Sequence, residues 1–344
     1  MIIRLCHTLT EELSQIDQQE SKKGYLPIVD AAGNLRALTT RTDLKKKQAF
    51  PLATTDKAGK LIVGAAVRAN GTGDLEFARI SALHNAGCNI IILDAQNGDN
   101  HQQVELIKLI KKEYPSLDVI AGNVVRVSQA KSLLDAGADA LRIGMGVGSV
   151  ATTQLVKAVG RAQLSSIYAC ALLAKQYGVP VIADGGICNT GCLIKALAIG
   201  ASCVMMGSLL AGVDESPGDY FFQDGMRLKH YRGNFSPVPA KFCPSPTRAS
   251  GVRHSIGSAF ETAPEFRLAS GVSGAVVDKG PLTQYFPYLC QSVRHGLQDM
   301  GVMSLTQTWE QLYKGELRFE VRSPSAQKEG GVHDLHSFQQ RLYA

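Results

Sequence analysis

The sequence is poor in aromatic residues. Phe, Trp and Tyr make up 6 % of its 344 residues, and only one of them is Trp. A surface that stacks nucleic-acid bases needs several aromatic side chains, so this class of binding protein is disfavoured. Charged residues are also few, at 19 %, and the net charge of +6 is modest for the length. We therefore expect neither a nucleic acid nor a membrane surface as a partner.

Paired CxxC motifs are lacking as well. The eight Cys are scattered and form no CxxC framework, so a zinc site is not expected. Residues 1–15 carry polar and acidic side chains through their middle, which is not the pattern of a secretory signal. Long apolar runs are absent too, because the uncharged stretch at 196–213 is interrupted by glycine. Buried free thiols are typical of a reducing compartment, and we predict a cytoplasmic protein.

Glycine and aliphatic residues are abundant instead, and they follow a repeating pattern. From residue 61 onward, short apolar runs alternate with helical patterns that close at Gly. The runs are apolar at successive positions, which indicates parallel strands buried on both faces. Such alternation predicts a βα barrel or a doubly wound sheet, with six strands where a closed barrel needs eight. The expected strands are 61–67, 88–93, 118–121, 140–143, 179–183 and 202–206, and the expected helices are 74–86, 101–114, 128–136, 153–177 and 190–199.

The beginning of the chain follows a different pattern. Residues 25–30 and 35–39 are predicted to form two strands joined by a turn at Gly33-Asn34, and a helix is possible before them at 13–23. We predict a small α+β fragment at 1–55 and a partial α/β barrel at 56–344, with loops rich in Pro and Gly over 209–281 and a helix at 282–300.

Polar residues and glycines follow the expected strands, where a barrel binds its ligand. Two glycine turns, Gly185-Gly186 and Gly207, follow the last two strands, and Ser208 adds a hydroxyl. Backbone N–H groups at these positions commonly bind phosphate, although the glycines are also explained as simple turn residues. Asp184 suits a ribose diol or caps the next helix, and Asp94 holds the hydroxyls of a second ligand or caps a helix.

A third glycine-rich loop, at 144–149, has a different spacing. Its glycines alternate, which is not the dinucleotide-binding fingerprint. Carbonyl groups of such a loop are able to ligate a cation, and spacing alone leaves this open.

Seven segments are distinctive in this sequence: 41–46 (RTDLKK), 183–187 (ADGGI), 204–210 (VMMGSLL), 220–222 (YFF), 231–233 (YRG), 271–276 (GVSGAV) and 329–333 (EGGVH). They closely resemble segments of inosine 5′-monophosphate (IMP) dehydrogenases of the eukaryotic type. The resemblance runs over 24–343 and is densest over 61–233 and 271–343. GMP reductases share the barrel and match the tail less well.

The resemblance implies a TIM barrel with a two-part CBS regulatory module inserted near its start, assembled as tetramers. It implies oxidation of IMP by NAD⁺ and water to xanthosine 5′-monophosphate (XMP), through attack of a Cys thiolate on purine C2. The IMP phosphate and ribose would bind to Ser149, Asp184, Gly186, Gly207, Ser208, Tyr231 and Gly233. The nicotinamide and purine would lie near Asp94, Asn123 and Arg142. A potassium ion would bind to Gly146, Gly148 and the carbonyl of residue 151, completed by Glu329, Gly330 and Gly331 from a neighbouring subunit.

The departures from the family pattern concern the chemistry itself. The family's nucleophile loop reads Gly-Ser-Ile-Cys-x-Thr, and here Ala151 stands in place of the Cys, whereas Thr153 beside the attacking water is kept. In the flap, at about 234–270, the Arg-Tyr pair that activates water falls on Ser258 and Ala259. Loss of the thiolate predicts a rate lower by several orders of magnitude. The family's first two barrel strands find no counterpart in the sequence, whose start resembles the end of a CBS module.

Four hypotheses remain open at this point. The favoured one is a catalytically inactive family member that retains binding of IMP or a related purine nucleotide. The second is an active IMP dehydrogenase or GMP reductase with a rearranged site. The third is a non-catalytic subunit that joins intact IMP dehydrogenase in a homo- or hetero-tetramer, and the fourth is the product of a decayed gene copy.

Overall fold

The computed structural model describes residues 3–4, 24–29, 32–51, 53–57, 59–69, 74–232 and 271–337. The chain divides into two compact units, Met1–Val63 and Gly64–Ala344. The helix expected at 13–23 lies outside the described residues, as do Gly233, Ser258 and Ala259.

The first unit contains a three-stranded sheet in the order β1-β2-β3. β2 and β3 are antiparallel, and Gly33 has a φ of 87° in the turn between them, a conformation that glycine adopts without strain. The expected strand, turn and strand are therefore confirmed. The elements are β1 (Ile3–Arg4), β2 (Tyr25–Val29), β3 (Leu35–Thr40) and α2 (Arg41–Ala49).

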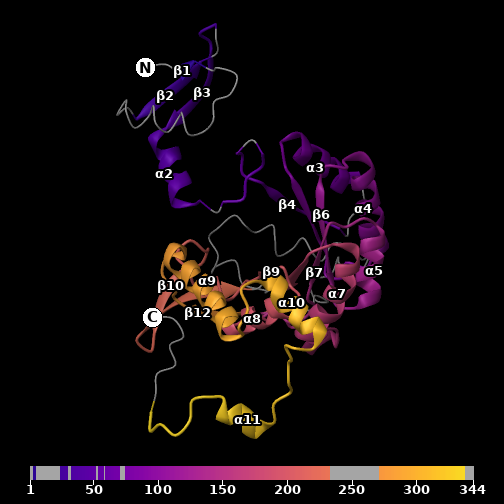
Figure 1. Cartoon of the computed structure of the whole chain (residues 1–344), viewed down its shortest axis with the longest axis vertical. Helices are drawn as coiled ribbons and strands as arrows, with labels where there is room; N and C mark the ends of the chain where they lie inside the picture. The colour runs from indigo at the N-terminus through magenta and orange to yellow at the C-terminus, as the bar shows by residue number, and fades with distance from the viewer. Residues whose placement is uncertain are drawn as a thin grey trace, which may run out of the picture. The chain divides into compact units, whose positions relative to one another are not determined.

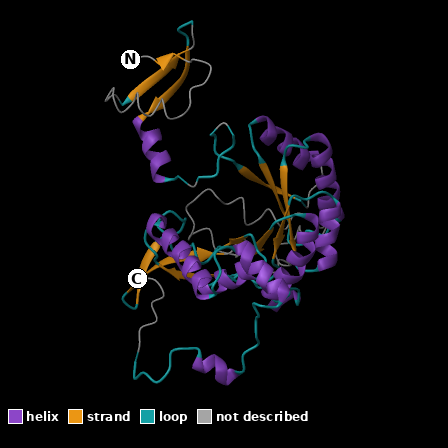
Figure 2. Ribbon diagram, viewed as in Figure 1, coloured by secondary structure: helices purple, strands orange, loops and turns teal. Residues whose placement is uncertain are grey.

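The second unit is built on six parallel strands in the sequential order β4 to β9. The sheet curls into part of a barrel, with helices along its outer side (Figures 1 and 2). The predicted incomplete TIM barrel of six strands is confirmed. The strands are β4 (Gly64–Arg68), β5 (Ile90–Asp94), β6 (Asp118–Val124), β7 (Ala140–Ile143), β8 (Val181–Asp184) and β9 (Cys203–Met205).

One of the helix predictions for the segments between these strands is wrong. The single helix expected over 153–177 is two helices, α6 and α7, because Ala158 adopts a left-handed φ of 55° and ends the first of them. The chain then turns so tightly that a Cβ at Gly160 would lie 2.4 Å from Cγ of Gln154. The helices are α3 (Asp74–Asn85), α4 (His101–Glu113), α5 (Val127–Asp135), α6 (Thr153–Lys157), α7 (Gln163–Tyr177) and α8 (Thr190–Ala198).

The rest of the second unit is an antiparallel sheet in the order β10-β11-β12 and three further helices. The helix expected at 282–300 is confirmed as α9. The indole N–H of Trp309 donates to the carbonyl of Leu197 at 2.8 Å and holds α10 against α8. The elements are β10 (Tyr220–Gln223), β11 (Met226–Arg232), β12 (Ser273–Val277), α9 (Leu282–Asp299), α10 (Leu305–Lys314) and α11 (Pro324–Glu329).

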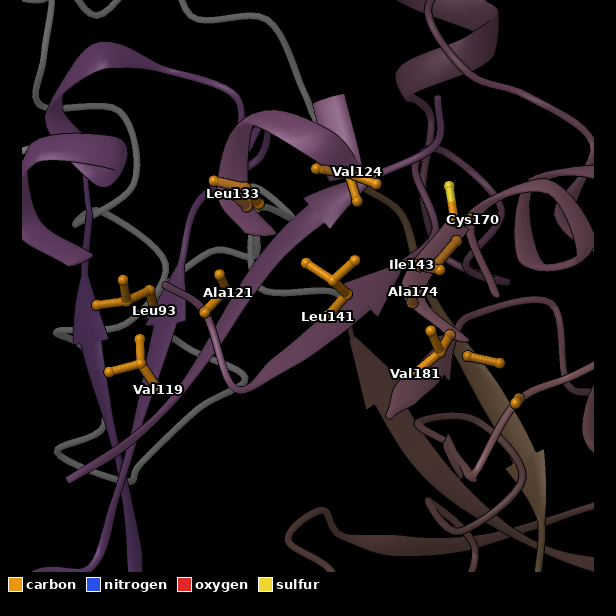
Figure 3. Packing of buried hydrophobic residues seen from close by; sticks show 14 of the residues in the cluster. Leu93, Val119, Ala121, Val124, Leu133, Leu141, Ile143, Cys170, Ala174 and Val181 are labelled. Carbon is orange, nitrogen blue, oxygen red and sulfur yellow. The ribbon is translucent and has the colours of Figure 1, made fainter. Parts of the chain in front are cut away.

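The core lies between the curled sheet and its helices. Figure 3 shows Leu93, Val119 and Leu141 from three successive strands packed in it, all fully buried. The expectation of buried thiols is wrong for part of the chain: of the described cysteines Cys170 is buried, but Cys188 and Cys203 are exposed. Within the described ranges, no helix is long and apolar enough to cross a bilayer.

Candidate functional site

A cavity opens at the carboxyl ends of the barrel strands. Its volume is about 460 Å³, within the range of sites for small ligands. The loop around Gly144–Ala151 and the first residues after β5 and β8 form its wall. The structure thus brings together many of the site residues expected from the sequence, and those that line the cavity are Asp94, Asn123, Arg142, Gly146, Gly148, Ala151, Thr153 and Asp184.

Arg142 is at the centre of a polar network in this cavity. Its side chain is 11 % exposed, and its guanidinium donates to Asp94 Oδ1 at 2.7 Å and to Asn123 Oδ1. The Nε atom lies 3.6 Å from Asp184 Oδ2. Asn123 in turn donates from Nδ2 to Asp184 Oδ2 at 2.9 Å and to the carbonyl of Gly144 at 2.8 Å. Parallel strands bring the four side chains together, because they lie at or near the ends of β5, β6, β7 and β8.

The loop that carries Ala151 is held at several points. The carbonyl of Gly146 accepts from Gln154 Nε2 at 2.8 Å, and the carbonyl of Gly148 accepts from the N–H of Ala151 at 3.0 Å. Ala151 forms an antiparallel bridge with Gly271, so the first residue after the undescribed 233–270 segment lies against this loop. These contacts place the methyl group of Ala151 at the cavity wall.

The described cysteines do not replace a thiol at position 151. None of the six lines the cavity. Burial raises the pKa of Cys170 to about 11, so that side chain is a protonated thiol at neutral pH. Since the thiolate is the reactive form, the described part of the chain offers no activated sulfur to a ligand in this cavity.

The glycine turns expected to bind phosphate make close contacts with neighbouring residues. Gly185 and Gly186 have φ values of 88° and 74°, and a Cβ at Gly185 would lie 3.3 Å from the backbone nitrogen of Gly148. A Cβ at Gly207 would lie 3.1 Å from the hydroxyl oxygen of Tyr231, so this backbone and the hydroxyl are close neighbours. Burial raises the pKa of Tyr231, which keeps its hydroxyl a hydrogen-bond donor at neutral pH.

Other expected residues do not line the cavity. Gly186, Gly207, Tyr231, Ser149 and Ser208 are absent from its wall. Glu329, Gly330 and Gly331, at the end of α11, are absent from it too.

Two residues of this region were not expected from the sequence. Gln163 donates from Nε2 to the carbonyls of Ile143 and Asp184, at 2.9 and 3.0 Å, and its buried Oε1 has no hydrogen-bond partner among the described residues. Lys157 also lines the cavity. Thr153 and Lys157 are four residues apart and therefore lie on one face of a helix. This spacing could have indicated Lys157 as a residue of the site. Nothing in the sequence distinguished Gln163.

Removing the guanidinium of Arg142 should destabilise the protein. The Arg142→Met change keeps the stem but leaves the carboxylates of Asp94 and Asp184 without their cation. Breaking a fully buried pair costs about 3–5 kcal/mol, and the carboxylates here are 35 % and 26 % exposed. We therefore expect a loss of about 1–3 kcal/mol in the free energy of unfolding, measured by urea denaturation.

A surface pair provides the matched control for this change. Lys108 contacts Glu105 at 3.0 Å, with the two side chains 55 % and 52 % exposed. Lys108→Met should leave the urea midpoint unchanged, since water screens exposed pairs. Equal midpoints for Arg142→Met and the unchanged protein would contradict a stabilising network.

Comparisons with known proteins identify related chains over nearly the whole sequence. The family model described as IMP dehydrogenase / GMP reductase domain matches residues 5–333. Inosine-5′-monophosphate dehydrogenase of Toxoplasma gondii is 47 % identical over 369 residues, which cover 95 % of this chain and 66 % of that protein. The Schizosaccharomyces pombe protein of the same name is 46 % identical over 328 residues, covering 94 % and 61 %.

A solved structure is similar as well. The crystal structure of a Cys-to-Ala variant of GMP reductase from Trypanosoma brucei, in complex with guanosine 5′-monophosphate, has a TM-score of 0.81 and 31 % sequence identity. The alignment covers 97 % of this chain and 65 % of that one. The chain thus spans 61–66 % of the length of these relatives.

Proposed function

Because the chain belongs to the IMP dehydrogenase / GMP reductase family, we propose that it binds IMP or a related purine nucleoside monophosphate without converting it. One observation carries the proposal: the cavity combines an ordered polar network with the methyl group of Ala151, the residue that by resemblance stands where the family has its nucleophile. Binding requires the network, and the family's covalent step requires the missing sulfur.

The nucleotide would bind across two groups of residues. Asp184 would accept hydrogen bonds from the ribose hydroxyls, since its carboxylate is 26 % exposed at the cavity wall. The phosphate would bind beyond the cavity, among the backbone N–H groups of Gly186 and Gly207 and the hydroxyls of Ser208 and Tyr231, with further contributions from Ser149 and Gly233. The closeness of Gly207 and Tyr231 supports this arrangement.

The chain's own residues do not support the covalent step. The methyl group of Ala151 forms no bond to purine C2. Thr153 lines the cavity and would still hold a water molecule, but it lacks a general base of its own. Ser258 and Ala259, which replace the flap's Arg-Tyr pair, are equally unable to take a proton from that water.

The residues around Arg142 fit the nicotinamide end of NAD. The carboxylate of Asp94 is 35 % exposed, and it and the amide of Asn123 present polar atoms to the cavity next to the guanidinium. NAD⁺, when bound, supplies a hydride acceptor. The role of Asp94, Asn123 and Arg142 would be to orient the ring and its ribose beside the purine.

The loop carbonyls also fit a potassium ion in part. The carbonyls of Gly146 and Gly148 each accept one hydrogen bond within the loop, which leaves a second lone pair for a cation. The carbonyl of residue 151 would join them, and Glu329, Gly330 and Gly331 would approach from a neighbouring subunit. The cation would stabilise the loop that carries Ala151.

Assembly into a tetramer, with itself or with intact IMP dehydrogenase, belongs to the same proposal. Within the described sheet, β4 and β9 are terminal strands with one neighbour each. An unpaired edge is a site for pairing with another chain, and this observation favours a non-catalytic subunit as the second candidate function. Residues 1–55 would be the end of a CBS module.

Calorimetry with IMP tests nucleotide binding, and NADH absorbance with IMP and NAD⁺ tests turnover. We expect a dissociation constant no tighter than about micromolar, roughly 8 kcal/mol, because the covalent contribution is missing. We expect no NADH above the background. Clear NADH formation would refute the proposal that the chain does not convert IMP. If no heat of binding is measured at millimolar IMP, the proposal of nucleotide binding is refuted.

Two aspartates provide a matched comparison. Asp184→Asn removes a charged acceptor for the ribose and should weaken IMP binding by about 10-fold or more. Asp135→Asn alters a carboxylate that pairs with Lys131 at 2.6 Å and does not line the cavity. This second variant should bind IMP like the unchanged protein.

A further inference from the structure

Two cysteines lie next to each other just outside the cavity. Cys188 is in the loop that follows β8, and Cys192 is in the first turn of α8. Their sulfur atoms are 3.5 Å apart. A disulfide bond is about 2.05 Å long, so the two sulfurs need to approach by roughly 1.5 Å, which is within the reach of side-chain rotation.

Asn189 holds both cysteines at the start of the helix. Its Oδ1 accepts from the backbone N–H of Cys192 at 2.9 Å, and its Nδ2 lies 3.6 Å from the sulfur of Cys188 as a donor. A Cβ at Gly191 would lie 3.2 Å from Asn189 Oδ1, so the small residue there suits the tight turn. Because this turn already brings the sulfurs together, little entropy is lost when they join.

Exposure and ionisation indicate how the pair would react. Cys188 is exposed and Cys192 is half-buried, so a small reagent in solution reaches them. The hydrogen bond with Cys192 raises the pKa of the Cys188 thiol. A raised pKa lowers the thiolate fraction and disfavours a fast peroxide sensor. It does not disfavour slow exchange, whose end point depends on how well the two sulfurs are placed.

We propose that Cys188 and Cys192 are a modification site that forms a reversible disulfide by exchange with a low-molecular-weight disulfide such as oxidised glutathione. The thiolate of Cys188 attacks one sulfur of the reagent, which forms a mixed disulfide and releases one glutathione thiolate. The sulfur of Cys192, after losing its proton to water, attacks the Cys188 sulfur and displaces the second glutathione thiolate. The protein pair is oxidised by two electrons and one reagent molecule is reduced.

This site adjoins the nucleotide cavity but does not depend on nucleotide binding. The loop that carries Cys188 begins at Gly185, directly after Asp184, and both of these residues line the cavity. A disulfide would tie this loop to the first turn of α8 and restrict its motion.

The full chain is equilibrated with defined ratios of reduced and oxidised glutathione, quenched in acid, alkylated with iodoacetamide and digested with trypsin. Residues 176–195 form one tryptic peptide that contains both cysteines and no other. We expect this peptide to lose two hydrogen atoms in mass and to escape alkylation as the buffer becomes more oxidising. The effective concentration of one thiol at the other should be in the millimolar range or above.

Cys203 is the internal comparison, because its peptide, residues 196–227, contains a single exposed cysteine. This peptide should gain only a glutathione adduct, and Cys203→Ser should leave the disulfide unchanged. Cys188→Ser and Cys192→Ser should each leave a single thiol that forms a mixed disulfide. The proposal is overturned if the 176–195 peptide remains a dithiol, or takes up two glutathione molecules, in buffers that glutathionylate Cys203.

Discussion

Replacing Ala151 by Cys is expected to change a chain that forms no covalent adduct into one that is labelled once per chain by an electrophilic IMP analogue. A 6-chloropurine ribonucleoside monophosphate is a suitable reagent, since a thiolate adds to the purine and chloride leaves. Position 151 is at the wall of the cavity that holds Asp184 and Arg142, so a bound purine would lie near the new sulfur. Intact-protein mass spectrometry measures the adduct.

Two variants control for this result. Ala151→Ser introduces a hydroxyl, which is a poor nucleophile without a base, and should stay unlabelled. Met303→Cys places a thiol at a position that is 94 % exposed and away from the cavity, and should also stay unlabelled at the same reagent concentration. An adduct on the unchanged protein, or XMP production by it at an ordinary rate, would contradict our proposal that the site is inactive.

Replacing Gly144 by Ala is expected to destabilise the protein by about 3 kcal/mol or more. Gly144 has a φ of 146°, and a Cβ there would lie 1.9 Å from the carbonyl oxygen of Asp184. The neighbouring strand end would have to move, and with it the carboxylate that pairs with Asn123 and Arg142. Urea denaturation measures the loss of stability, and IMP calorimetry should show weakened binding in the same variant.

Gly315→Ala separates the two causes of this loss of stability, which are the positive φ and the close contact of the new Cβ. Gly315 also has a positive φ, 78°, but no atom of the described residues lies within 4 Å of a Cβ built there. Its substitution by Ala should lower the free energy of unfolding by only about 1–2 kcal/mol, because Ala must adopt the left-handed conformation but meets no close contact. If Gly144→Ala and Gly315→Ala lowered the free energy of unfolding equally, the close contact with Asp184 would contribute nothing to the loss.

The barrel and its family were predictable from the sequence because their signals are local. Successive apolar residues and Gly-closed helices predicted the six strands, and the structure confirms them. The motifs at 183–187 and 204–210 predicted the family, and the family match over residues 5–333 confirms it. The prediction of a single helix over 153–177 was wrong. The helical pattern of the sequence continues across 158–162, but a left-handed residue and a tight turn interrupt the helix there.

The sequence by itself predicted that Ala151 stands in place of a nucleophilic Cys, since that inference rests on residue identity within a motif that resembles the family's. It also placed Asp94, Asn123, Arg142 and Asp184 at or near strand ends, because strand patterns are local. Only the tertiary structure decided that these four side chains bond to one another, because hydrogen bonds between residues up to 61 positions apart depend on strand order and register. The same holds for Gln163, the first residue of α7, which contacts the carbonyls of two strand ends, and for the sulfurs of Cys188 and Cys192, which the turn at the start of α8 brings together.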